Sequence, residues 1–163
     1  GNKWEWLGLD GLEGWWLARR IFSDSMMERL TQEIRKSEAR HAGELVLAIE
    51  HDTPGHSRDT PSRALEVFGR LKVWDTPERS GLLLYISLNK HKFEIVADRG
   101  IRVDPKKWEE VCAILQTRFA AKEYEQGLLQ AIHATEAILQ AACGDQGTGD
   151  DGHNYLPDAP VLL

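Results

Sequence analysis

The sequence has only two cysteines, Cys112 and Cys143, and they lack the spacing that a zinc site or a small disulfide framework requires. It also lacks an apolar run long enough to span a bilayer. Lysine and arginine number 20 against 26 aspartate and glutamate, so the net charge is −6 and no basic stretch stands out. These absences argue against a zinc module, a membrane-spanning segment and a protein that binds the backbone of nucleic acid.

Three common catalytic signatures are missing as well: the GxSxG elbow, the Walker loop and the HExxH helix. Cys112 and Arg118 match the spacing of thiol phosphatases, but the residues between them follow a helical pattern. A phosphate cradle needs free backbone N–H groups in a loop, which a helix does not offer. We therefore expect Cys112 to be a buried core residue and not a nucleophile.

The chain starts at Gly1 and shows no charged stretch followed by an apolar core, the pattern of a secretion signal. We expect a soluble, cytoplasmic protein. A signal or anchor already removed from the N-terminus remains the alternative, because the first residue is not methionine.

Composition predicts one domain with an extension at each end. With 163 residues, 42% of them hydrophobic, the chain can build one ordinary core. We expect an arm over 1–22, the domain over 23–143, and a Gly- and Asp-rich mobile linker with an apolar, docked tail over 144–163. The arm either packs on the domain or, like the tail, binds a protein partner, or it lies on a membrane surface. Four of the six tryptophans lie in this arm, namely Trp4, Trp6, Trp15 and Trp16.

Hydrophobic periodicity predicts a first helix that begins at Ser23 or Ser25, since either serine can cap it, and ends at Gly43. Its inner face is expected to comprise Met27, Leu30, Ile34 and His41. A second helix is capped by Thr60, with Pro61 at its first position. The buried stripe of this second helix is expected to be Ala64, Phe68 and Leu71. Further helices run from Asp104-Pro105 to 119 and from 124 to 142.

Strands are predicted at 44–50 and 82–88, both apolar on two faces, and at 93–97 after a short polar turn. The first two are joined by the helix at Thr60 and run parallel, while the last two form an antiparallel hairpin. This order predicts an α/β fold with a small mixed sheet and helices on both faces.

Strand direction gathers acidic residues at one end of this sheet, where the first two strands start and the third ends. Four carboxylates from four segments converge there: Glu38, Glu44, Asp75 and Asp98. Carboxylate oxygens are the ligands that calcium and magnesium prefer, and a cation would offset the repulsion among them. The pattern predicts a divalent-cation site.

Two alternatives use the same end of the sheet. The helix near Lys106 and Lys107 directs the positive end of its dipole there, which would suit a phosphate. In the other alternative, the acids form an ordinary salt-bridge cluster with Arg40, Arg79, Arg99 and Arg102.

The opposite end carries Glu50, His51, Asp52, His56 and the basic turn 90–92. Histidines near an acid can bind transition metals, but His51 and His56 lie five residues apart in a loop without fixed geometry. We expect solvent-exposed loop histidines there.

These stretches resemble the TPM domain family, to which a phosphatase activity has been ascribed, and in particular its short, soluble bacterial branch. The likeness covers about residues 23–163. The matching stretches are Ser37-Glu38, Gly43-Glu44, Val73-Trp74-Asp75-Thr76, Glu94 to Ile101, Trp108 and Asn154-Tyr155-Leu156-Pro157-Asp158. The resemblance implies a three-layer α/β/α sandwich, cation binding as in some relatives, and acid phosphatase activity as in a plant relative. Two positions depart from the family: a single acid, Asp24, precedes the first helix where the lumenal branch has a pair, and Ser80 replaces the usual Asn.

Three functions are consistent with the sequence. The leading one is a TPM-like accessory or interaction module that binds Ca²⁺ or Mg²⁺ through some of Glu38, Glu44, Asp75 and Asp98. The second is a metal-dependent phosphomonoesterase in which the cation and Arg99 or Lys106 hold the phosphate while an activated water attacks, although no residue stands out as nucleophile or base. The third is a structural domain that binds proteins through its arm and tail.

Overall fold

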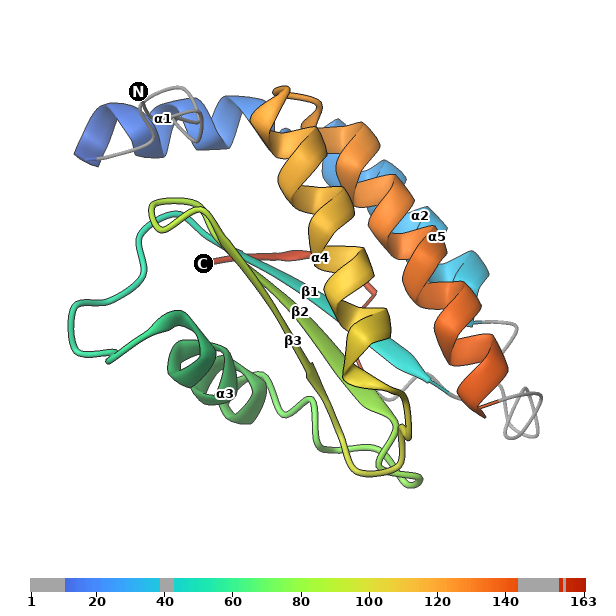
Figure 1. The fold of residues 1–163 in the computed structure, drawn as a ribbon. Helices are drawn as coiled ribbons and strands as arrows, with labels where there is room; N and C mark the ends of the chain where they lie inside the picture. Colours follow the sequence, from blue (N-terminus) through green and yellow to red (C-terminus); the bar gives the residue numbers. More distant parts are fainter. Residues whose placement is uncertain (1–10, 39–42, 144–155, 157) are drawn as a thin grey trace.

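The computed structural model describes residues 11–38, 43–143, 156 and 158–163, which form nine elements (Figure 1). The helices are α1 (Gly11–Ile21), α2 (Asp24–Glu38), α3 (Thr60–Arg70), α4 (Pro105–Ala120) and α5 (Tyr124–Cys143). The strands are β1 (Glu44–Glu50), β2 (Gly81–Ser87), β3 (Lys92–Ala97) and β4 (Val161–Leu162). Within these residues, no helix combines the length and the apolar character needed to cross a membrane.

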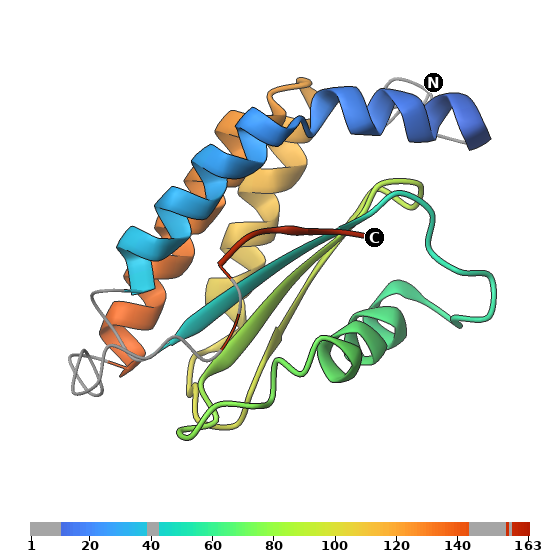
Figure 2. The ribbon, with the colours of Figure 1, turned by 180° about the vertical axis from the view of Figure 1, so that it is seen from behind.

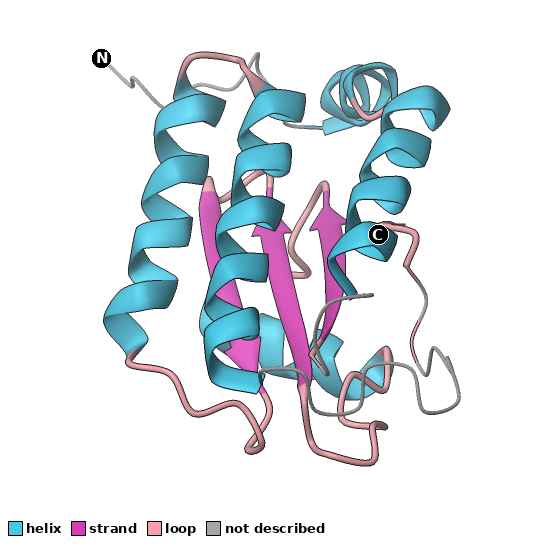
Figure 3. Ribbon diagram, turned by 90° about the vertical axis from the view of Figure 1, so that its right-hand side faces the viewer, coloured by secondary structure: helices cyan, strands magenta, loops and turns pink. Residues whose placement is uncertain are grey.

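The four strands form one mixed sheet in the order β3-β2-β1-β4. β1 runs parallel to β2 and to β4, while β3 runs antiparallel to β2. Helices α2, α4 and α5 cover one face and α3 covers the other (Figures 1 and 2). Figure 3 shows the helices standing on both sides of the strands. The predicted α/β/α sandwich, with a parallel pair and a hairpin, is confirmed.

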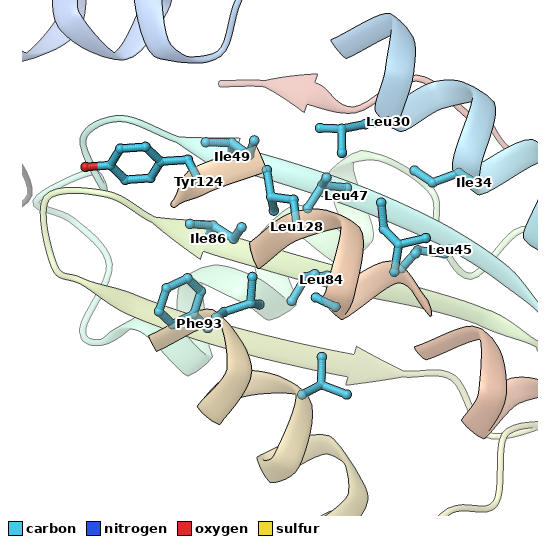
Figure 4. Packing of buried hydrophobic residues seen from close by; sticks show 14 of the residues in the cluster. Leu30, Ile34, Leu45, Leu47, Ile49, Leu84, Ile86, Phe93, Tyr124 and Leu128 are labelled. Atoms are coloured by element: carbon cyan, nitrogen blue, oxygen red, sulfur yellow. The ribbon is translucent and has the colours of Figure 1, made fainter. Parts of the chain in front are cut away.

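The larger core lies between the sheet and helices α2, α4 and α5. Leu45, Leu47 and Ile49 of β1 face Leu30 and Ile34 of α2 (Figure 4). A smaller core under α3 contains Val46, Ala48, Leu83 and Tyr85, the residues that alternate with the first set along β1 and β2. Both faces of β1 and β2 are therefore buried, as the apolar runs predicted.

Helix α2 is capped by Ser23, whose Oγ accepts the Met26 N–H at 3.3 Å. Its inner face holds Met26, which is 3% exposed, whereas Met27 is half-buried, so the predicted register was wrong by one position at the first turn. The predicted inner position of His41 lies outside the described residues.

Helix α1 was not predicted, because its glycines and paired tryptophans hide the helical period. Ala18 and Phe22 join the larger core and are only 2% and 3% exposed, while Trp16 is 60% exposed. Trp4 and Trp6 lie outside the described residues. The last turn of the predicted arm therefore packs as part of the domain.

Helix α3 is capped by Asp59, whose carboxylate accepts the Ser62 N–H at 2.8 Å, and not by Thr60 as predicted. The Thr60 hydroxyl instead donates to Glu94 of β3 at 2.6 Å. The buried stripe is also shifted from the prediction, since it includes Arg63 and leaves Phe68 only half-buried.

The described end of the tail contacts the sheet. β4 pairs with Ala48 and Ile49 of β1, and Leu163 donates its N–H to the Ile49 carbonyl at 2.7 Å. Figure 2 shows this segment running along the outer edge of β1. Leu156 inserts into the smaller core and is 5% exposed.

Candidate functional site

The sheet brings Glu44 and Asp98 to the same end and the same face. Glu44 pairs with Gly81 across the parallel strands, and Asp98 donates its N–H to the Gly81 carbonyl at 2.9 Å. Strands lie roughly 4.8 Å apart, so the Cα atoms of Glu44 and Asp98 lie about 10 Å apart on either side of Gly81. The predicted convergence of strand ends is therefore present.

The Val73 backbone nevertheless lies between these two acids. A β-carbon at Gly81 would collide with the carbonyl oxygen of Val73, so only glycine lets this backbone approach the sheet so closely. Glu44 is thereby separated from Asp98. Asp75, on the loop that follows Val73, is exposed, and only its backbone N–H is fixed, by the Lys72 carbonyl at 2.9 Å.

Glu38 and Glu44 meet a third acid, Asp158, which the sequence did not place there. We call these three side chains the carboxyl cluster. Glu38 Oε1 accepts the Leu45 N–H at 3.2 Å, and Glu44 Oε1 accepts the Leu156 N–H at 3.0 Å. The cluster thus fastens both the start of β1 and the C-terminal tail.

The carboxyl cluster perturbs the ionisation of its own members. Burial, together with the adjacent carboxyls of Asp158 and Glu44, raises the pKa of Glu38 to about 10. Arg35 donates to Asp158 Oδ2 at 3.2 Å from the exposed side. The Asp158 carboxyl also shares a hydrogen bond with that of Glu38, and its Oδ1 is buried.

Asp98 also has an unpartnered oxygen. Its side chain is 8% exposed, and Oδ1 accepts the Arg99 N–H at 2.7 Å, but Oδ2 is buried without a hydrogen-bond partner. In the described part of the chain, Arg79, Arg99 and Arg102 form no ion pair, so the predicted salt-bridge cluster is not formed by these three. Arg40 lies outside that part.

The start of α4 already has an acidic cap. Asp104 accepts the Lys106 N–H at 3.0 Å, so a carboxylate occupies the positive end of this helix. Lys106 and Lys107 are exposed. Their predicted role in holding a phosphate has no further support from these contacts.

Within the described ranges, no three His, Cys, Asp or Glu side chains are arranged so that they could hold a metal ion as they stand. Glu38 and Glu44 are brought together, Asp98 is separated from them by Val73, and Asp75 is exposed. Asp158 is the residue that sequence reasoning missed. The stretch around it was part of the family resemblance, but its position depends on how the tail docks.

The opposite end of the sheet holds a buried ion pair that the sequence did not predict. Arg63 of α3 donates to both oxygens of Glu50 at 2.9 Å each, and the two side chains are 5% and 7% exposed. The Tyr85 hydroxyl donates to Glu50 at 2.5 Å. Hydrogen bonding to Glu50 raises the pKa of Arg63, while burial raises the pKa of Tyr85.

The histidines at this end behave differently from one another. His51 is 8% exposed, so its predicted solvent exposure was wrong, because it continues β1 between Leu163 and Asn89. His56 is exposed and hydrogen-bonds Glu66 at 3.1 Å, as expected for a loop histidine.

Cys112 is a core-facing residue of α4, as predicted. Its thiol contacts the Phe93 carbonyl at 3.7 Å, and burial raises its pKa to about 11. Arg118 is engaged by Glu123 and Gln130 at 3.0 Å each. A thiol phosphatase needs the opposite, a lowered thiol pKa in an anion-binding loop.

Comparison with solved structures supports the fold. The chain is similar to the BA42 protein from the psychrophilic bacterium Bizionia argentinensis, with a TM-score of 0.75, 24% identity, and coverage of 86% of this chain and 94% of that one. It is also similar to the N-terminal domain of a protein from P. gingivalis, with a TM-score of 0.60, 17% identity and 82% coverage of both chains. No curated protein matches.

The family is shown by the sequence itself. The family model of the TPM domain matches residues 18–138. This range is most of the chain and runs from the end of α1 into α5. The match begins within α1, in agreement with the packing of Ala18 and Phe22 in the core. The chain belongs to the TPM domain family.

Proposed function

We propose that this chain is a divalent-cation-binding module, and that calcium or magnesium binds at the end of the sheet where Glu38, Glu44 and Asp98 lie. The observation that carries the proposal is the buried Oδ2 of Asp98, which has no hydrogen-bond partner. A buried carboxylate oxygen without a donor is costly, and a bound ion is one of the few ways to satisfy it.

The other acids support the same proposal. Burial raises the pKa of Glu38, and the neighbouring carboxyls of Asp158 and Glu44 raise it too, so a nearby cation would favour the charged form of Glu38. Glu38 accepts the Leu45 N–H and Glu44 accepts the Leu156 N–H, so backbone contacts hold both carboxyl groups in place. All the donors are hard oxygens, which suits Ca²⁺ and Mg²⁺ better than a transition metal.

Binding at this end requires side chains to turn, because the described acids do not yet form a ligand set. Val73 divides the end into a part with Glu38 and Glu44 and a part with Asp98, with Asp75 exposed on the nearby loop. Oxygen ligands of calcium are flexible in number and geometry, so a rotation of carboxylates is compatible with binding. The proposal is for a binding or accessory module and includes no catalytic step.

The test is a titration of the full chain with calcium chloride and magnesium chloride, followed through backbone amide shifts. We expect shifts at Leu45 and Arg99, whose N–H groups contact Glu38 and Asp98. Asp98→Asn or Glu44→Gln should weaken binding by about tenfold or more, since affinity follows the number of charged ligands.

A matched control is Asp52→Asn, which changes an exposed acid at the opposite end of the sheet and should bind as the wild type does. Amide shifts that stay unchanged at both Leu45 and Arg99 up to millimolar cation would refute the proposal.

A further inference from the structure

The two edges of the sheet differ in length. One edge is β4, which pairs with only two residues of β1, whereas the other is β3, a strand of six residues (Figures 1 and 2). β3 contains no proline and pairs with β2 in one unbroken register, so it has no bulge. Proteins usually protect a long edge strand from other chains with such features or with lysines, and β3 has only Lys92 at its first position. β3 is therefore the edge at which a further strand would pair.

Alternate residues of β3 direct their backbone groups away from β2. Asp98 donates its N–H to the first carbonyl of β2 at 2.9 Å, so residues 92, 94 and 96 bond to β2 as well. The N–H and C=O groups of Phe93, Ile95 and Ala97 then face outward. The Cys112 thiol contacts the Phe93 carbonyl at 3.7 Å, in agreement with this direction. In the described part of the chain, no strand pairs with this outer side.

Helix α3 adds an apolar border to the same edge. It contacts both β2 and β3, and its Arg63 reaches across to Glu50 of β1. Leu65 lies about 160° around the helix from Arg63, so it points away from β1 and past β3. Leu65 is 62% exposed, and Phe68 beside it is half-buried. An exposed leucine next to an open strand edge is typical of an interaction surface.

We infer that β3 pairs with β3 of a second copy of this chain, antiparallel about a two-fold axis at Ile95, so that one sheet continues through a dimer. Strands that pair antiparallel about a two-fold axis present the same surface to each other, which makes such an interface self-complementary. This inference goes beyond the proposed function and uses neither Glu38 nor Glu44.

Charge favours one register of this pairing. The outward-facing residues of the two copies must lie opposite one another, so the axis passes at residue 94, 95 or 96 if most of the strand is to pair. An axis at 94 places Glu94 opposite its own copy, and an axis at 96 places Glu94 opposite Asp98. An axis at 95 instead places Lys92 opposite Asp98, twice by symmetry, and Glu94 opposite Val96. Opposite charges across an antiparallel pair stabilise it and like charges destabilise it.

The same pairing brings the two α3 helices together. Because α3 lies over β2 and β3, the two helix axes would be about two strand spacings apart, or roughly 10 Å. Packed helices lie at about this distance. Leu65 and Phe68 of each copy border the contact, so the dimer would cover the leucine that a single chain exposes.

Sedimentation velocity of the full chain tests the inference, with a chelator present so that cation binding plays no part. We expect a monomer–dimer equilibrium with Kd below about 1 mM. Lys92→Glu turns two opposite-charge pairs into two like-charge pairs and should weaken association by about tenfold or more. Leu65→Lys changes an exposed side chain and should weaken association by about tenfold, because apolar area is lost in both copies. Lys36→Glu makes the same charge change on α2, on the other face of the sheet, and should associate as the wild type does.

The register has its own readout in a sample that mixes isotope-labelled and unlabelled protein. Glu94 and Val96 of the other copy would form a non-hydrogen-bonded pair, with Cα atoms about 4.5 Å apart, so their Hα protons should give an intermolecular NOE. Exchange of the Ile95 and Ala97 N–H groups with solvent should slow as the protein concentration rises.

Three results would overturn the inference. A chain that remains monomeric at about 1 mM would show that β3 does not pair with itself, and the edge would then fit an extended segment of another protein. A dimer that Lys92→Glu leaves unchanged would use a different surface. An intermolecular NOE between the two Glu94 Hα protons would show a different register. None of these results bears on cation binding, so the proposed function is tested separately.

Discussion

Replacing Arg63 by methionine tests how the opposite end of the sheet is stabilised. The Glu50–Arg63 pair is bidentate, with both nitrogen–oxygen distances at 2.9 Å, and its side chains are 7% and 5% exposed. Methionine fills much of the same volume but supplies no charge, so Glu50 would be left buried with only the Tyr85 hydroxyl as its donor. Removing one partner of a buried ion pair costs about 3–5 kcal/mol.

The loss can be measured by urea and thermal unfolding at pH 7. For a chain of this size, each kcal/mol lowers Tm by about 2–4 °C, so Arg63→Met should melt roughly 6–20 °C below the wild type. The unpaired, buried Glu50 should have a raised pKa in the folded variant. The unpaired charge of Glu50 then destabilises the folded variant at neutral pH, and this destabilisation fades as the pH falls toward the ordinary pKa of glutamate. The difference in the free energy of unfolding between Arg63→Met and the wild type should therefore shrink near about pH 4.5.

Two comparisons make this reasoning refutable. Glu50→Gln together with Arg63→Met removes both charges, and the double variant should be more stable than the sum of the single losses predicts. Arg58→Met changes an arginine that is 87% exposed and should alter stability by less than about 0.5 kcal/mol. A loss below about 1 kcal/mol for Arg63→Met, or strictly additive losses in the double variant, would show that Glu50 does not depend on this arginine.

Three further outcomes follow from the same contacts. Gly81→Ala should lower the free energy of unfolding by at least about 1–3 kcal/mol in urea titrations, because its β-carbon collides with the backbone of Val73. Cys112, with a pKa of about 11, should react with iodoacetamide at pH 8 roughly 100-fold more slowly than an exposed cysteine, as followed by mass spectrometry of the intact chain. Glu38 has a folded pKa of about 10, above its unfolded value, so cation-free protein should lose stability as the pH rises from about 4.5 to 10. Glu38→Gln should flatten this part of the pH profile measured by thermal unfolding.

The strands and their pairing could be predicted because β1 and β2 are apolar on both faces and their polar ends are sharply marked. The ends of helices were less predictable. Asp59 and Thr60 are both good caps, and the choice of Asp59 depends on Glu94 of β3, which engages the Thr60 hydroxyl. A local pattern contains no information about that tertiary partner.

Arg63 and Asp158 are the charged residues whose positions sequence reasoning missed. Each of them contacts a partner that is distant in the chain. Arg63 stands four residues before Val67 on the inner face of α3, a signal that it is buried, but its need for Glu50 appears only when the helix packs. Asp158 likewise acquires neighbours only when the tail docks. Four acids were expected to lie together, yet of these only Glu38 and Glu44 do so. Strand direction predicts which end of the sheet a residue reaches, but it does not show that the Val73 backbone lies between Glu44 and Asp98.

The two ends of the sheet satisfy buried acids in different ways, and this difference indicates which end should respond to a cation. Glu50 is matched by a full positive charge from Arg63, whereas Glu38 contacts the backbone N–H of Leu45, which carries only partial charge, and the carboxyl of Asp158. An added cation should therefore stabilise Glu38 more than Glu50. Glu44 and Glu50 are the two ends of β1, about 20 Å apart at the rise of an extended strand. At that distance the effects of Arg63→Met and of calcium on stability should add, and a departure from additivity would mean that β1 couples the two ends.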